Sequence, residues 1–363
     1  MKTMNEVFWL RSLSCLTVVL LHAITTTIIH YYPSPDNSTH TILRSLQMLM
    51  MYGTPMFVFI SEFLIAYRYR YGVKQGFLSK RVKFILIPYI VMGLFYAVVY
   101  QAPHGIGSIL SKWGDHVFFG AYHGYFILII FQFYILHLLF DRALRKMNAK
   151  ATLFAAFVVN AAYLAFFNFN DPQNYGMDPD TWTRLTNLPF LAWLFYFVAG
   201  YYAGRYFGQF KQFVIKTRKW HLPFLVGSAA LVLVLYHTEA LVAVGSKRFD
   251  IILLTTAVMV IMFSTAFRLK RIPPELVVVS QYSFGIYLLH PFFQLVIARN
   301  IKNFTTTDNM FVLISIFFGL GVLLPMAVTN LLNRIPYGQY IVGKVGVGKK
   351  RETARQSEQA KAA

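Results

Sequence analysis

Residues 7–29, VFWLRSLSCLTVVLLHAITTTII, are the stretch that decides the fold. A helix needs ~20 mostly apolar residues to cross the hydrocarbon core of a bilayer, and this run reaches that length. It is too long for the apolar part of a cleavable signal peptide, and no small-residue cleavage site follows it. The stretch therefore predicts a membrane-spanning helix near the start of the chain.

The rest of the chain has the same character. It has 363 residues, 57% of them hydrophobic and only 13% charged, against about 25% charged residues in a soluble domain. We predict an all-α, polytopic membrane helical bundle of about ten transmembrane helices, residues 1–340, followed by a disordered basic cytoplasmic tail, residues 341–363. The predicted spans lie near residues 7–29, 42–66, 84–101, 124–140, 151–169, 188–207, 222–243, 250–267, 277–298 and 311–332.

The basic residues orient this bundle. The net charge is +20, and with the N-terminus inside, 26 of the 34 Lys and Arg residues fall in predicted cytoplasmic segments. This bias is typical of correctly assigned membrane topologies, and it places both termini in the cytoplasm. The charges lie in short clusters between apolar runs, so the sequence favours a lipid bilayer, and not a nucleic acid, as the partner. We expect a multi-pass protein of the cell (plasma) membrane.

Ionisable residues inside a span are costly and are functional candidates by default. Arg11 and His22 are eleven residues apart on the first predicted helix, which is close to three turns, so they share a face with Cys15 between them. Arg11 lies near the inner boundary, and His22 lies roughly 16 Å further out. The alternative is that Arg11 reaches the inner headgroups and that His22 bonds a neighbouring backbone group.

Two later spans carry further candidates. Glu62 lies at the depth of Arg11, and we expect the two to form an ion pair, structural or catalytic, because an unpaired carboxylate there would be expensive. His290 lies at the depth of His22, so both could line one cavity, although a lone His on an apolar helix is more often a packing residue. Pro291 beside it predicts a local kink. His123 belongs to residues 102–123, a predicted outer loop.

The cluster Lys80-Arg81-Val82-Lys83 enters the third span from the cytoplasm. Such a cluster can bind lipid headgroups or a polyphosphate, or it can simply fix the topology. The sequence has no glycine-rich phosphate loop, no GxSxG and no HExxH, so it supports neither ATP hydrolysis nor a metal site. Cys15 is a poor candidate for an acyl-carrying nucleophile, because burial disfavours its thiolate.

Several stretches together resemble the acyltransferase-3 family of membrane proteins, which modify cell-surface and secreted polysaccharides. They are Arg11 with His22 after ten residues, GTPMFVFISEFL (53–64), FLSKRVKFILIPY (77–89), HGYF (123–126) and SFGIYLLHP (283–291). The similarity spans nearly the whole chain. The departures are Phe84 in place of the second arginine of an Arg-x-x-Arg pair, Glu62 in place of glycine and Tyr125 in place of tryptophan.

The resemblance implies a membrane O-acyltransferase that binds no cofactor and takes its acyl group from a cytoplasmic acyl-CoA co-substrate. The acceptor would be a hydroxyl of an extracytoplasmic polysaccharide, with His22 as general base. Arg11, Arg81 and Lys83 would bind the donor, and Glu62, His123 and His290 would line the acceptor side or the cavity. The alternative function is a polysaccharide exporter or flippase without chemistry.

Overall fold

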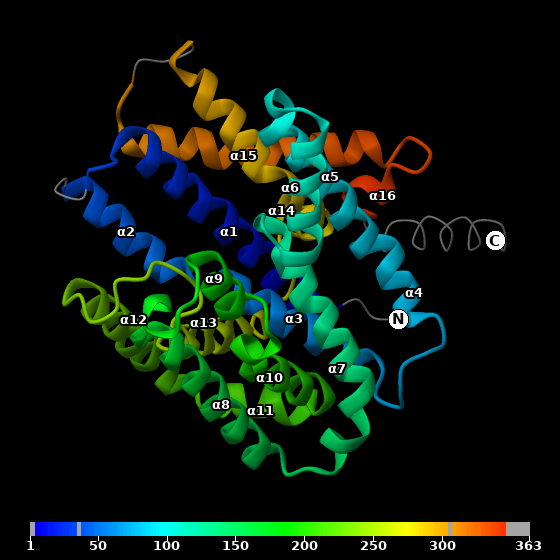
Figure 1. The fold of residues 1–363 in the computed structure, drawn as a ribbon. Coiled ribbons are helices and arrows are strands. Elements are labelled where there is room, and N and C mark those ends of the chain that lie inside the picture. The colour runs from blue at the N-terminus through cyan, green and yellow to red at the C-terminus, as the bar shows by residue number, and fades with distance from the viewer. Residues whose placement is uncertain (1–3, 35–37, 304–306, 346–363) are drawn as a thin grey trace.

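The computed structural model describes residues 4–34, 38–303 and 307–345, and within these ranges its regular structure is entirely helical (Figure 1). The α-helices are α1 (Asn5–Tyr31), α2 (Ser38–Met50), α3 (Gly53–Arg68), α4 (Phe77–Arg81), α5 (Ile87–Gln101), α6 (Ile106–Phe119), α7 (Phe126–Lys146), α8 (Ala149–Phe169), α9 (Pro179–Asn187), α10 (Leu194–Arg205), α11 (Phe207–Lys216), α12 (His221–His237), α13 (Ile251–Ala266), α14 (Pro274–Asn300), α15 (Met310–Leu332) and α16 (Gln339–Val342). A π-helical turn, η1 (Val82–Leu86), joins α4 to α5.

The predicted helical membrane bundle is confirmed. Among the described residues, eight helical segments are long and apolar enough to cross a bilayer, and α13 is a shorter apolar helix of 16 residues. The sixth predicted span, 188–207, is formed by the short helix η5 (Phe190–Trp193) and the 12 residues of α10. Short and interrupted helices are tolerated at membrane depth where protein surrounds them. Most of the predicted tail, residues 346–363, lies outside the described residues.

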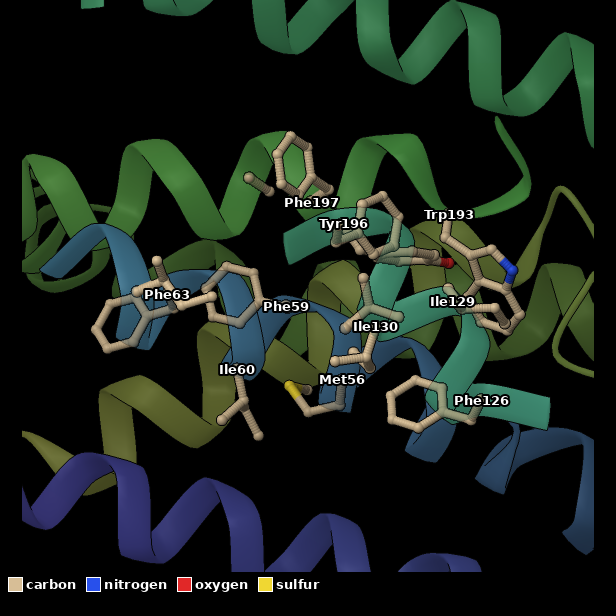
Figure 2. Packing of buried hydrophobic residues seen from close by; sticks show 14 of the residues in the cluster. Met56, Phe59, Ile60, Phe63, Phe126, Ile129, Ile130, Trp193, Tyr196 and Phe197 are labelled. Carbon is tan, nitrogen blue, oxygen red and sulfur yellow. The ribbon is translucent and has the colours of Figure 1, made fainter. Parts of the chain in front are cut away.

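Other parts of the protein surround helix α10. Every residue from Tyr196 to Gly204 is buried, and the helix packs against α3 through two glycines. A Cβ atom at Gly200 would lie 2.6 Å from the carbonyl oxygen of Phe59, and one at Gly204 would lie 2.3 Å from that of Phe63. Glycine four residues from glycine lets two helix backbones approach closely. Figure 2 shows the apolar side chains that fill the adjoining core.

The prediction that residues 102–123 form a loop is wrong in one respect, because this segment contains the 14-residue helix α6. After a turn at Gly105 (φ 86°), α6 returns alongside α5. Trp113 donates its indole N–H to the carbonyl of Ile90 over 3.1 Å, and His116 Nδ1 donates to the carbonyl of Gly93 over 2.9 Å. These two bonds satisfy the indole N–H of Trp113 and the Nδ1–H of His116. The sequence did not predict α6 because Ser, Lys, Asp and His interrupt its apolar residues.

Candidate active site

Three histidines from distant parts of the chain meet inside the bundle. The ring centroids of His22 on α1 and His290 on α14 are 5.0 Å apart, and those of His123 and His290 are 6.0 Å apart. His290 is fully buried, whereas His22 and His123 are half-buried. The structure therefore brings together all three histidines that the sequence singled out. His123 joins them because α6 turns back, so that α7 starts near His290.

A proline inside α14, Pro291, lies directly after His290. Pro291 has no N–H, and at the next position the N–H of Phe292 bonds to the Tyr96 hydroxyl over 3.2 Å. The same hydroxyl donates to the carbonyl of Leu288 over 2.9 Å. The side chain of Tyr96 on α5 is thus inserted into the hydrogen-bond ladder of α14, a recognised cause of helix distortion. The kink predicted at Pro291 stays a prediction, and the insertion of the Tyr96 hydroxyl lies at the same place in the helix.

The hydrogen bonds distinguish the three imidazoles. A carbonyl oxygen only accepts, so His290 Nδ1 donates to Ile286 over 2.9 Å and His123 Nε2 donates to Leu288 over 3.2 Å. These bonds leave His290 Nε2 and His123 Nδ1 as acceptors. Within the described part of the chain, the ring of His22 makes no hydrogen bond, so both of its nitrogens are available. His22 also has no carboxylate partner there.

Arg11 on α1 and Arg81 on α4 come together near the start of α1, the end that is predicted to face the cytoplasm. The guanidinium of Arg81 lies 5.3 Å from the ring centroid of Tyr134 on α7, and Arg11 interacts electrostatically with both Tyr134 and Arg81. Neither arginine has an ion-pair partner among the described residues. Two uncompensated cations at one place repel each other and attract an anion. Lys83 is not part of this group, because it lies over the ring of Tyr340, 5.3 Å from its centroid.

The expected ion pair between Glu62 and Arg11 is wrong. Glu62 Oε1 instead lies 2.5 Å from His137 Nδ1, and both side chains are 1% exposed. The pairing joins α3 to α7, whereas Arg11 on α1 lies beside Arg81. Glu62 therefore does not orient His22. Matching by depth alone selected the wrong partner, because depth does not specify which face of α3 the carboxylate occupies.

Sequence reasoning missed the tyrosines that hold the histidines. Tyr287 donates a hydrogen bond to the carbonyl of His123 over 2.5 Å, and the ring of Tyr122 lies 5.2 Å from that of His123. The ring centroids of Tyr96 and His123 are 4.6 Å apart. The sequence offers only its high tyrosine content, 23 residues, as a signal, and tyrosine is also common at membrane–water interfaces.

The fold and the site together define a multispanning membrane protein with a cluster of three histidines inside the bundle and a pair of arginines near the start of α1. The family model described as "Acyltransferase domain" matches residues 5–330. The chain therefore belongs to the acyltransferase-3 family and is a membrane acyltransferase, a multi-pass protein of the plasma membrane.

Its relatives match over nearly their full length. The chain is 34% identical over 352 residues to "Putative membrane-bound acyltransferase YfiQ" of Bacillus subtilis, covering 94% of both chains. It is 26% identical over 350 residues to "Probable poly-beta-1,6-N-acetyl-D-glucosamine export protein" of Staphylococcus aureus, covering 93% of this chain and 95% of that one. The protein of the same name from Staphylococcus epidermidis is also 26% identical. No solved structure matches the chain.

Proposed function

We propose that this acyltransferase moves an acyl group from a cytoplasmic acyl-CoA to a hydroxyl of an extracytoplasmic polysaccharide. The observation that carries the proposal is the arrangement on α1. A pair of uncompensated arginines lies at its inner end, and an imidazole free of hydrogen bonds to described residues lies eleven residues further out. A transferase that works across a bilayer needs an anion site and a base at different depths, and α1 carries both His22 and one of the two arginines.

The donor side rests on Arg11 and Arg81. Coenzyme A carries phosphates, and arginine binds phosphate through charge-assisted, often bidentate hydrogen bonds. A bound diphosphate would relieve the repulsion between the two guanidinium groups. Arg81 also precedes the π-helical turn η1, and such turns in helices are frequent at functional sites. Lys83 lies within this turn, but it lies over the ring of Tyr340 and not beside the two arginines.

His22 is assigned the role of general base. Its neutral imidazole accepts the proton of the sugar hydroxyl while the hydroxyl oxygen attacks the thioester carbonyl. The new C–O bond forms, the C–S bond breaks, and the imidazolium returns its proton to the departing sulfur, which gives the polysaccharide ester and free CoA thiol. His290 and His123 are already fixed by backbone carbonyls, so they act as neighbours that line the site and orient the reacting groups.

The test compares two histidine variants. His22→Gln removes the base while keeping a polar side chain, and His104→Gln changes an exposed histidine outside the cluster. We expect His22→Gln to lower acyl transfer at least 100-fold, since general base catalysis contributes typically 10²–10⁴-fold. Membrane insertion and donor binding should be retained, and His104→Gln should act like the parent. Near-parental transfer by His22→Gln would show that His22 is a packing residue.

Donor binding is tested separately. Arg81→Ala should weaken binding of a non-hydrolysable acyl-CoA analogue about 10-fold or more, because a hydrogen bond to a charged group contributes ~1.5–3 kcal/mol. Lys83→Ala is the matched variant, and it should weaken binding less, since Lys83 lies beside Tyr340 and not beside Arg11. If Arg81→Ala binds the acyl-CoA analogue as well as the parent, the cluster of residues 80–83 only fixes the membrane topology.

Export without chemistry is the second candidate, and the names of the staphylococcal relatives favour it. The two candidates give opposite phenotypes in a strain that lacks the protein. Loss of an acyltransferase leaves secreted polysaccharide without ester groups, whereas loss of an exporter leaves polymer inside the cell. Mass spectrometry of the secreted polysaccharide, together with measurement of the intracellular polymer, distinguishes them.

A further inference from the structure

A polar cleft of about 280 Å³ opens beside the histidine cluster, on the side predicted to face outward. It lies between α6, α9 and the start of α7, and the clustered histidines do not line it. Ligand pockets usually start at ~300 Å³, so this cleft suits a short part of a larger ligand. Its lining includes Lys112, Asp115, Phe119, Tyr125, Asp180 and Arg184.

The charged groups of this cleft are free to bind a ligand. Within the described residues, no side-chain hydrogen bond or ion pair engages Lys112, Asp115 or Asp180. The guanidinium of Arg184 lies over the ring of Phe119 at 4.4 Å. The lining of the cleft contains two carboxylates and two cations, so its net charge is zero. The arginine pair at the inner mouth, in contrast, has a net positive charge. The balance of charges in the cleft disfavours a polyanion such as CoA and suits a ligand with many hydroxyl donors and acceptors.

The cleft and the histidine cluster share one turn of the chain. At Gly120 the backbone is left-handed (φ 61°), and a Cβ there would lie 2.7 Å from that of Tyr125. The tight turn puts Tyr125 in the wall of the cleft, while His123, two residues earlier, bonds α14 beside His290. Lys247 Nζ donates a hydrogen bond to the Tyr125 hydroxyl over 3.2 Å. The wall of the cleft is thus linked to His123, and through it to the histidine cluster, by a turn of five residues.

We infer that this cleft is the acceptor subsite, which holds a sugar unit of the polysaccharide next to the unit that is acylated. The inference rests on the proposed function and adds to it the place where the acceptor binds. Asp115 and Asp180 accept hydrogen bonds from sugar hydroxyls, and Lys112 donates to sugar oxygens. The aromatic ring of Tyr125 offers a flat apolar surface to the sugar ring.

A cysteine-protection experiment tests the subsite without using catalysis. Thr183→Cys places a thiol in the wall of the cleft, and Gln173→Cys places one in η4 (Pro172–Tyr175), outside the cleft. The single native cysteine, Cys15, is buried. Each variant, in membranes, is labelled with an impermeant maleimide in the presence of unesterified polysaccharide from cells that lack the protein. We expect the polysaccharide to slow labelling of Thr183→Cys at least fivefold and to leave Gln173→Cys unchanged, while CoA protects neither.

The outcomes separate the subsite from the proposed function. Equal labelling of Thr183→Cys with and without polysaccharide overturns the subsite, even where acyl transfer is observed. Protection that persists in the His22→Gln background supports the subsite, even where the role of His22 fails its own test. As a second readout, Asp115→Asn with Asp180→Asn should raise KM for the acceptor about tenfold with kcat and the donor KM unchanged. A change confined to the donor KM would contradict the assignment.

Discussion

The hydroxyl of Tyr96 offers a sharp test of how the site is held together. Tyr96 is 0% exposed, and its hydroxyl bridges the N–H of Phe292 and the carbonyl of Leu288 on either side of Pro291 in α14. In Tyr96→Phe, the Leu288 carbonyl keeps the hydrogen bond from His123, but the Phe292 N–H loses its hydrogen bond to the Tyr96 hydroxyl. One orphaned buried donor costs about 1–3 kcal/mol. This is below the ~5–15 kcal/mol that keeps a typical protein folded.

The functional effect should exceed the effect on stability. Relaxation of α14 moves His290 and His123 relative to His22, and a misplacement of about 1 Å in an active site can lower a rate 100-fold. We expect acyl transfer by Tyr96→Phe to fall at least tenfold, with the donor KM unchanged, in detergent-solubilised protein that remains folded. Tyr100→Phe is the matched control, since Tyr100 lies one turn further along α5 and its hydroxyl makes no hydrogen bond to a described residue. Equal turnover by the two variants would refute the reasoning.

Three further predictions concern other contacts. Gly204→Ala places a Cβ 2.3 Å from the carbonyl oxygen of Phe63, so it should lower the free energy of unfolding by about 1–3 kcal/mol, whereas Gly208→Ala, which meets nothing within 4 Å, should not. His137→Ala leaves the buried Glu62 carboxylate unpaired and should cost about 3–5 kcal/mol. Thermal unfolding of His137→Ala is compared with that of the double variant His137→Ala with Glu62→Ala. If the double variant is no more stable than His137→Ala, the pairing of Glu62 with His137 is contradicted. Cys15→Ala should keep acyl transfer within about twofold of the parent, measured as initial rates; a complete loss would indicate an acyl-enzyme at Cys15.

The helices were predictable because each one leaves a local pattern in the sequence. Apolar runs located the spans, and counting along α1 and α14 placed His22 and His290 at one depth, where their rings lie 5.0 Å apart. Two glycines four residues apart, Gly200 and Gly204, are a further local signal that could have located the close contact between α10 and α3.

Partners across the bundle were not predictable in this way. Glu62 pairs with His137 because α3 faces α7 at that point, and the chain spacing of 75 residues carries no trace of that contact. The insertion of Tyr96 beside Pro291 is similar, since the proline indicated a distortion but not the side chain that fills it. Helix α6 was missed because polar residues interrupt its apolar face.

The position of Cys15 favours direct transfer over an acyl-enzyme. Cys15 lies between Arg11 and His22 on the shared face of α1, but it is 2% exposed and its thiol lies 3.8 Å from the carbonyl of Ser283 on α14. Close packing against α14 closes that part of the face to a substrate. Helix α7 carries Tyr134 beside Arg81 and begins next to His123. Helix α7 thus connects the two ends of the site that α1 defines, so a bulky substitution on the face of α7 between them should block transfer without affecting either binding step.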